Sequence, residues 1–127
     1  MRRALGRTNL RSAPESVAEA RCWLAGLLGR DHRAFRDIEL MTSELVTNAI
    51  KYADSAGVFL IVDEVDENRI RVEVVDGGHP VNKPHFGDGT SDFAEGGRGL
   101  HIVRMLAADS GTGGDACGRT VWFEVTF

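Results

Sequence analysis

The chain has few of the features that staple a small protein together or carry it across a membrane. Only two of its 127 residues are cysteine, Cys22 and Cys117, and neither belongs to a CxxC pair. Their scarcity argues against a disulfide scaffold and a zinc knuckle. No apolar run approaches the roughly 20 residues that a membrane-spanning helix needs, and none of signal-peptide length follows the basic start. We therefore expect a cytoplasmic protein with no membrane partner.

Positive charge is not in excess either. Fifteen Lys and Arg residues stand against 19 Asp and Glu residues, which gives a formal net charge of -4. A nucleic-acid-binding domain usually carries a basic face, so we expect no direct contact with nucleic acid. The four histidines form no HxxxH or HxH pair that would indicate a metal site. The length and the 43% hydrophobic content predict one globular domain over residues 1–127.

The hydrophobic pattern predicts helices packed on one face of a sheet. The basic residues 1–11 could form an edge strand or remain loose, and the sequence leaves both open. Asp31 is expected to cap the second helix, and residues 111–118 are interpreted as a glycine-rich connection. The order of elements predicts an α+β two-layer sandwich with a mostly antiparallel mixed sheet. The expected elements are helices over 12–28, 32–53 and from 100 onward, and strands over 58–65, 69–75 and 120–127.

A polar stripe lies within the otherwise apolar second helix. Glu44, Asn48 and Lys51 stand at i, i+4 and i+7, so one helical face presents a carboxylate, an amide and an ammonium. A carboxylate can take a proton, an amide oxygen can ligate a hard cation, and an ammonium can contact phosphate oxygens. The alternative is the solvated face of an amphipathic helix.

Two glycine-bearing segments follow the stripe. Asp76-Gly77-Gly78 leaves a strand, where a carboxylate could accept a hydrogen bond from an exocyclic amine such as that of adenine. Gly96-Gly97-Arg98-Gly99 opens a helix, whose backbone N–H groups could bind an anion. Arg98 could add a bidentate phosphate contact. The alternatives are a simple turn and a loop that ends in a helix cap, but together the three segments indicate a magnesium–nucleotide site.

Known phosphate-binding motifs of other kinds are absent. The sequence contains neither GxxxxGK[ST] nor GxGxxG. Between the two glycine segments, residues 79–98 have no periodicity and many turn-forming residues. A loop of this length in a small domain is usually a lid or binding loop, or else disordered.

The order of these segments resembles that of the GHKL superfamily of ATP-binding domains. Within it, the chain is similar to the stand-alone anti-sigma-factor serine kinases and their actinobacterial relatives. The likeness covers about residues 12–127, and Pro80 takes the place of the last glycine of the DxGxG motif. The matching segments are Glu44–Ala49 for the asparagine motif, Asp76–Pro80 for DxGxG, Gly97–Leu100 for GxGL and Gly118–Thr120 for the final G-x-T.

The resemblance implies an ATP site of the Bergerat type. Asn48 would ligate the Mg²⁺ that bridges the phosphates. Asp76 would bind the adenine amine with support from Thr120, and Gly78 would let the base approach. Gly97 and Gly99 would hold the phosphates as residues 79–98 close as a lid. The other nucleotide contacts implied are Lys51, Tyr52, Arg98 and Leu100.

Glu44 separates the branches of this superfamily. Histidine kinases usually carry asparagine four positions before the magnesium-binding asparagine, whereas serine kinases and hydrolysing members carry a glutamate that serves as a base. Such a base typically contributes about 10²–10⁴ in rate. The resemblance thus implies a serine/threonine kinase that phosphorylates an anti-sigma-factor antagonist, binds a sigma factor and forms a homodimer. The alternatives are a non-catalytic, nucleotide-dependent protein-binding module and a histidine-kinase-like catalytic domain.

Overall fold

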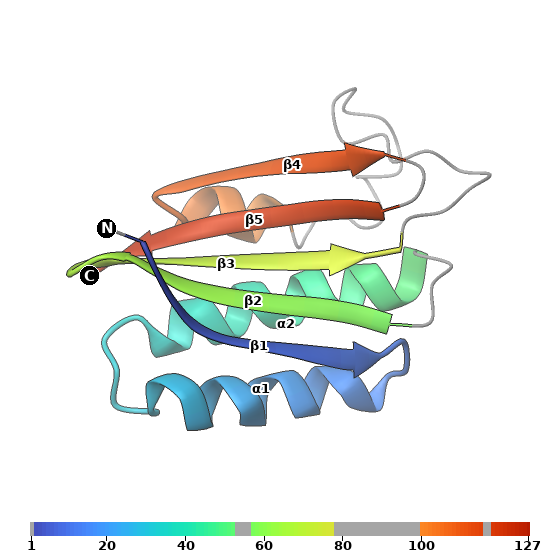
Figure 1. Ribbon diagram of the computed structural model, residues 1–127, viewed down its shortest axis with the longest axis horizontal. Helices are drawn as coiled ribbons and strands as arrows, with labels where there is room; N and C mark the ends of the chain where they lie inside the picture. Colours follow the sequence, from blue (N-terminus) through green and yellow to red (C-terminus); the bar gives the residue numbers. More distant parts are fainter. Residues whose placement is uncertain (1, 53–56, 78–99, 116–117) are drawn as a thin grey trace.

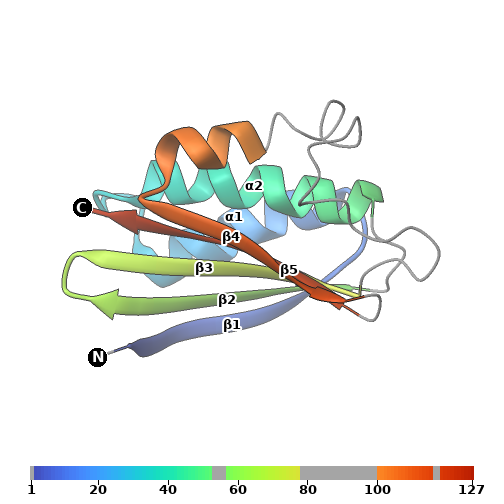
Figure 2. The same cartoon turned by 90° about the horizontal axis from the view of Figure 1, so that it is seen from above.

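The protein has two layers, a five-stranded sheet and a set of helices that cover one of its faces (Figures 1 and 2). The computed structural model describes residues 2–52, 57–77, 100–115 and 118–127. This arrangement confirms the α+β two-layer prediction. The elements are β1 (Arg3–Arg11), α1 (Glu15–Leu28), α2 (Phe35–Tyr52), β2 (Gly57–Asp66), β3 (Arg69–Asp76), a helix over 100–106, β4 (Asp109–Asp115) and β5 (Gly118–Thr126).

The strands follow the order β1-β2-β3-β5-β4, and all four described pairings are antiparallel. The predicted hairpin between β2 and β3 is present. In its turn the Asn68 N–H donates to Oδ1 of Asp66 at 2.8 Å, which closes an Asx-type turn. Along β3, Ile70, Val72 and Val74 are buried and their neighbours are less so, as the alternation in the sequence predicts.

The structure decides one local feature that the sequence left open and corrects two expectations. Residues 1–11, left open in the sequence, contain the edge strand β1, which pairs with β2. Residues 111–118 are not simply a connection, because 109–115 form the edge strand β4 along β5. Asp31 does not cap the second helix. That helix starts at Phe35, and the Ala34 N–H donates to Nδ1 of His32 at 3.0 Å instead.

The core lies between the sheet and the helices. α2 contacts β2, β3 and β5 across the middle of the sheet, while α1 packs on α2 and β1. Full burial of each large apolar side chain contributes roughly 1.5–3 kcal/mol relative to leaving it exposed. The C-terminal half of α2 is thereby fixed above the ends of β3 and β5. The largest fully buried side chains include Phe123, Leu24, Ile38, Met41, Leu60 and Ile70.

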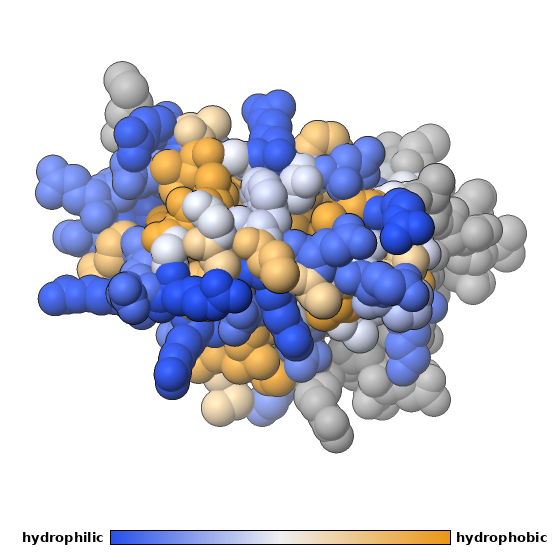
Figure 3. All heavy atoms as spheres, turned by 90° about the horizontal axis from the view of Figure 1, so that it is seen from below, coloured by the Kyte–Doolittle hydropathy of each residue, from blue (hydrophilic) through white to orange (hydrophobic). Residues whose placement is uncertain are grey.

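The outer side of β1 and α1 is largely hydrophilic, with apolar patches between charged side chains (Figure 3). Trp23 and Leu27 of α1 are partly buried, and both pack against Gly6 of β1. A Cβ at Gly6 would lie 2.9 Å from Cδ1 of Leu27, so the close approach of helix and strand requires glycine there. Neither α1 nor α2 combines the length and the apolar character that a membrane span needs.

Candidate functional site

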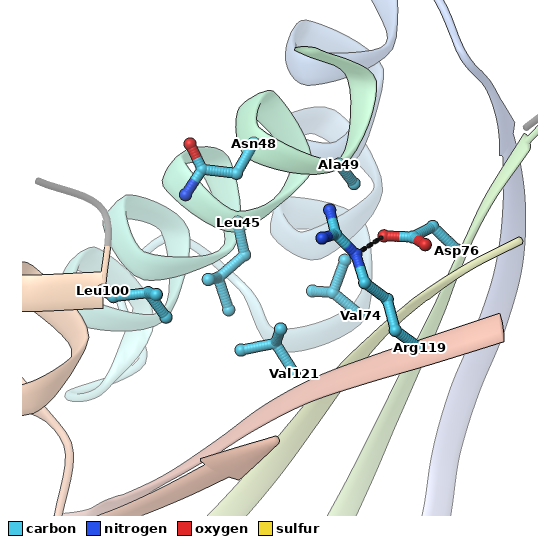
Figure 4. Close-up of a pocket in the computed structure, with 8 residues that line it drawn as sticks. All are labelled: Leu45, Asn48, Ala49, Val74, Asp76, Leu100, Arg119 and Val121. Atoms are coloured by element: carbon cyan, nitrogen blue, oxygen red, sulfur yellow. Dashed lines mark hydrogen bonds and ion pairs between the residues drawn. The ribbon is translucent and has the colours of Figure 1, made fainter. Parts of the chain in front are cut away.

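A pocket between α2 and the ends of β3 and β5 brings together residues that are far apart in the sequence (Figure 4). The part of the pocket that the described residues enclose has a volume of about 20 Å³, which is room for about one water molecule. Three residues named from the sequence, Asn48, Asp76 and Leu100, share this pocket. The full lining is Leu45, Asn48 and Ala49 from α2, Val74 and Asp76 from β3, Leu100 from the helix over 100–106, and Arg119 and Val121 from β5.

The helical periodicity of α2 places Asn48 on the face that lines the pocket. Leu45 and Ala49 are buried at 3% exposure each, and Asn48 lies at the edge of the same face, partly buried. Figure 4 shows its amide on the side of the pocket away from Asp76. Amide oxygen is a hard ligand, and Mg²⁺ in nucleotide sites takes few protein ligands beside phosphate oxygens and water. The donor chemistry of Asn48 fits that ion.

The rest of the polar stripe runs from the core edge into solvent. Glu44 lies one turn before Asn48 on the same side of α2 and is partly buried, but it does not line the pocket. Lys51 is exposed near the helix end. Tyr52 is the last residue of α2, and its side chain lies outside the described part of the structure. The stripe is therefore only partly a solvated face.

Asp76 forms a buried ion pair at the other end of the pocket. Nε of Arg119 donates to Oδ2 of Asp76 at 2.9 Å, and the two side chains are only 13% and 4% exposed. The residues stand directly opposite each other on β3 and β5, so both side chains project from the same face of the sheet. Charges buried among apolar residues need such a partner, because removal of one leaves the other uncompensated.

The resemblance implied that Thr120 supports Asp76, but the structure places the two side chains on opposite faces of the sheet. Arg119 and Val121 both line the pocket, and successive side chains of a strand point to opposite faces. Thr120 therefore projects from the opposite face of the sheet, where its partner on β3 is Val75. The sequence reasoning missed Arg119. Val121, Phe123 and Val125 are buried on one face of β5. The two-residue period of a strand, continued back to position 119, predicts that Arg119 lies on the same face.

Several residues named from the sequence lie outside the described part of the structure. These are Gly78, Gly97, Arg98, Gly99 and the expected lid over 79–98. Leu100 is the first described residue after that range and is partly buried in the pocket wall. Within the described ranges, no three His, Cys, Asp or Glu residues group together as a metal cluster would require.

The comparisons with known proteins identify the family of this chain. A family model described as a histidine kinase-like ATPase domain matches residues 10–124. The serine-protein kinase RsbW of Staphylococcus aureus, in strains that include JH9 and Newman, is 31% identical over 111 residues. That match covers 75% of this chain and 70% of the relative.

Two solved structures share the fold. The crystal structure of the RsbU and RsbW domains of Rv1364c from Mycobacterium tuberculosis has a TM-score of 0.71 at 19% identity and covers 95% of this chain. The present chain spans 32% of that longer one. The Acinetobacter baumannii histidine kinase AdeS has a TM-score of 0.54 at 16% identity, with 96% of this chain and 68% of that one covered. At such identities the likeness concerns the fold alone.

Proposed function

Because the chain belongs to the family of histidine kinase-like ATPase domains, we propose that it binds Mg-ATP in the pocket between α2, β3 and β5 and phosphorylates a partner protein. The observation that carries the proposal is the meeting of Asn48, Asp76 and Leu100 in one pocket. Three separate sequence motifs supply these residues. Similarity to RsbW, which is named a serine-protein kinase, supports serine or threonine as the acceptor.

The two ends of the pocket have different chemistry. At one end the Asp76 carboxylate, held by Arg119, can accept a hydrogen bond from the exocyclic amine of adenine. At the other end the Asn48 amide would hold Mg²⁺, which neutralises phosphate charge when it is bound. Leu100 forms part of the apolar wall between them. Lys51, Tyr52, Gly78, Gly97, Arg98 and Gly99 remain proposed contacts to the nucleotide.

Glu44 is the proposed general base. It would accept the proton of a serine hydroxyl as that oxygen bonds to the γ-phosphorus, while the bond from the γ-phosphorus to the bridging oxygen breaks and ADP leaves. Its position one helical turn from Asn48, the proposed Mg²⁺ ligand, supports this role. A base of this kind typically contributes about 10²–10⁴ in rate.

The proposed substrate is an anti-sigma-factor antagonist, with a sigma factor as a second partner of a homodimeric protein. Similarity to RsbW supports the kinase part of this assignment. A non-catalytic module, whose nucleotide only sets partner affinity, is the second candidate. The observation that favours it is that Glu44 is not among the residues that line the pocket.

A thermal-shift measurement tests nucleotide binding. Mg-ATP at about 100 times its Kd should stabilise the protein by about 2.7 kcal/mol and raise the Tm by roughly 5–15 °C. Asp76→Asn should weaken binding by about 10–100-fold, the value of one hydrogen bond to a charged group. Thr120→Val is the matched control, since Thr120 projects from the opposite face, and it should leave the affinity unchanged. An unchanged Tm for the wild-type protein would contradict the proposal.

A phosphotransfer assay with radiolabelled ATP and candidate antagonist proteins tests catalysis. Glu44→Gln should lower the transfer rate by about 10²-fold or more, with little change in the affinity for Mg-ATP. Asp37→Asn, an exposed carboxylate on the same helix, serves as the control. If wild-type protein binds Mg-ATP and responds to it but phosphorylates no antagonist, the non-catalytic module is the correct function.

A further inference from the structure

We propose that Arg119 determines base specificity in the nucleotide pocket by presenting an N–H donor beside the Asp76 acceptor. This inference rests on the proposed function, because it concerns the same pocket. It assigns a role to a residue at the position that the G-x-T motif leaves unspecified.

The geometry fixes the two groups side by side. Asp76 and Arg119 are paired residues of adjacent antiparallel strands, and the 2.9 Å bond holds the guanidinium against the carboxylate. Figure 4 shows the terminal nitrogens of Arg119 directed toward α2, across the interior of the pocket. The pair is not a surface ion pair, because the side chains are 4% and 13% exposed. A ligand that reaches Asp76 therefore also meets Arg119.

The pair presents a simple hydrogen-bond pattern. An ionised carboxylate only accepts hydrogen bonds, and a guanidinium only donates them. A guanidinium carries five N–H groups in a fixed fork, so it can bond a carboxylate and still donate to a further acceptor. A base fits this pattern when it offers a donor and an acceptor at neighbouring positions of one edge.

Adenine has this edge, with the 6-amino group as donor and N1 as acceptor. The 6-oxo group and N1–H of guanine or hypoxanthine reverse the two positions. Since the proposed phosphate contacts lie at the Asn48 end, the base cannot be freely turned over. In guanine or hypoxanthine the 6-oxo group would then face Asp76, and the N1–H would face Arg119. The base would meet two mismatched groups, whereas a pocket with Asp76 alone would present one. Sites built to hydrogen-bond a ligand reject mismatched analogues strongly.

The alternative is that Arg119 only compensates the charge of Asp76. The two roles differ in their response to N1. If Arg119 donates to N1, replacing that nitrogen by carbon weakens binding only while Arg119 is present. If Arg119 is only a counter-ion, it makes no contact with N1. Replacing N1 of the nucleotide by carbon then changes the affinity by the same factor in wild-type protein and in every Arg119 variant.

The test measures Kd by calorimetry for Mg-ATP and Mg-1-deaza-ATP with wild-type protein, Arg119→Met and Arg119→Gln. Wild-type protein should bind 1-deaza-ATP about 10–100-fold more weakly than ATP. Arg119→Met should bind both within about two-fold. Arg119→Gln, which keeps an N–H donor without the charge, should retain part of the difference and serves if the methionine variant does not fold.

Two controls separate the possible failures. The triphosphate of purine riboside lacks only the 6-amino group of ATP, which is the proposed hydrogen-bond donor to Asp76. Its affinity should be lower than that of ATP by the same factor in wild-type protein and in Arg119→Met. Thr120→Val should behave as wild-type protein throughout. An equal ATP to 1-deaza-ATP ratio in wild-type protein and Arg119→Met would overturn the role of Arg119 and leave ATP binding intact. Failure of the wild-type protein to bind ATP at all would overturn the proposed function as well.

Discussion

The guanidinium of Arg71 lies over the ring of Trp122, 3.9 Å from its centre, on the face of the sheet that the helices do not cover. The same guanidinium donates from Nη1 to Oε2 of Glu124 at 3.0 Å. Trp122 in turn lies against Gly111 of the edge strand β4. Three neighbouring strands are thus joined through side chains as well as through their backbone ladder.

Glu124→Gln should lower the stability of the fold in a pH-dependent way. Burial alone would raise the pKa of Glu124, but hydrogen bonds from Arg69 and Arg71 outweigh it and hold the pKa below the ordinary value of 4.5. The carboxylate therefore stabilises the folded state above pH 4.5, and this contribution is lost as the pH falls through the lower folded pKa. We expect Glu124→Gln to cost about 2 kcal/mol at neutral pH.

Urea unfolding from neutral pH down to acid pH measures this effect. The difference between wild-type protein and Glu124→Gln should shrink below about pH 4.5. Glu67→Gln, in the exposed turn between β2 and β3, is the control and should change the unfolding free energy by less than about 0.5 kcal/mol. A difference that stays constant with pH would show that the carboxylate charge of Glu124 is not what stabilises the sheet.

Gly111→Ala should destabilise the protein by about 1–3 kcal/mol. A Cβ at this position would lie 2.7 Å from Nε1 of Trp122, so the ring must move from its place under Arg71. Gly113→Ala is a matched control two residues along the same strand, where a Cβ meets nothing within 4 Å. Thermal unfolding followed by circular dichroism compares the two. Equal Tm values for the two variants would contradict the contact.

Thr42→Val should stabilise the fold by about 1 kcal/mol. Thr42 is 0% exposed, and its Oγ1 has no hydrogen-bond partner within the part of the chain that the structure describes. Replacing a buried, unsatisfied hydroxyl by a methyl group of similar size removes its desolvation cost. Thr47→Val on the same helix should give no gain, because Thr47 is an exposed residue and its hydroxyl already donates to the Ser43 carbonyl at 2.7 Å. Urea unfolding free energies decide between these outcomes.

Gly6→Ala and Gly26→Ala should change stability in opposite directions. At Gly6 the new Cβ would press on Leu27 at 2.9 Å and on Trp23 at 3.2 Å, which should cost about 1–2 kcal/mol. Gly26 is an exposed position within α1 where a Cβ meets nothing within 4 Å. Alanine there should gain roughly 0.5–1 kcal/mol from helix propensity. Urea unfolding measures both variants, and an unchanged or raised stability of Gly6→Ala would contradict the assigned packing of α1 on β1.

Much of the fold and half of the pocket follow from patterns within short stretches of sequence. The 3.6-residue period of α2 and the two-residue period of β3 fix which faces are buried. Asn48 sits at the edge of one such face, and Asp76 ends the strand that carries the other. Motifs that close an element in this way tend to meet at one end of a two-layer fold, and the structure brings them together.

The missed features depend on partners that are distant in the sequence. β4 contains three glycines in seven residues and has little strand propensity of its own, so its conformation comes from pairing with β5. Position 111 requires glycine because the ring of Trp122 on β5 lies against it, and a local sequence pattern does not reveal that contact. The inward position of Arg119 does not follow from its own segment, because a charged side chain is favourable there only with the Asp76 carboxylate opposite it on β3.

The strand order also constrains the sequence of events in folding. β2 and β3 are separated by two residues, as are β4 and β5, so each hairpin closes a short loop. The β1–β2 ladder begins with Arg11 opposite Gly57, and closing it must order the long segment that contains both α1 and α2. We expect this ladder to form after the rate-limiting step. Conservative substitutions at the β1 position Leu10 should then accelerate unfolding and leave the refolding rate nearly unchanged.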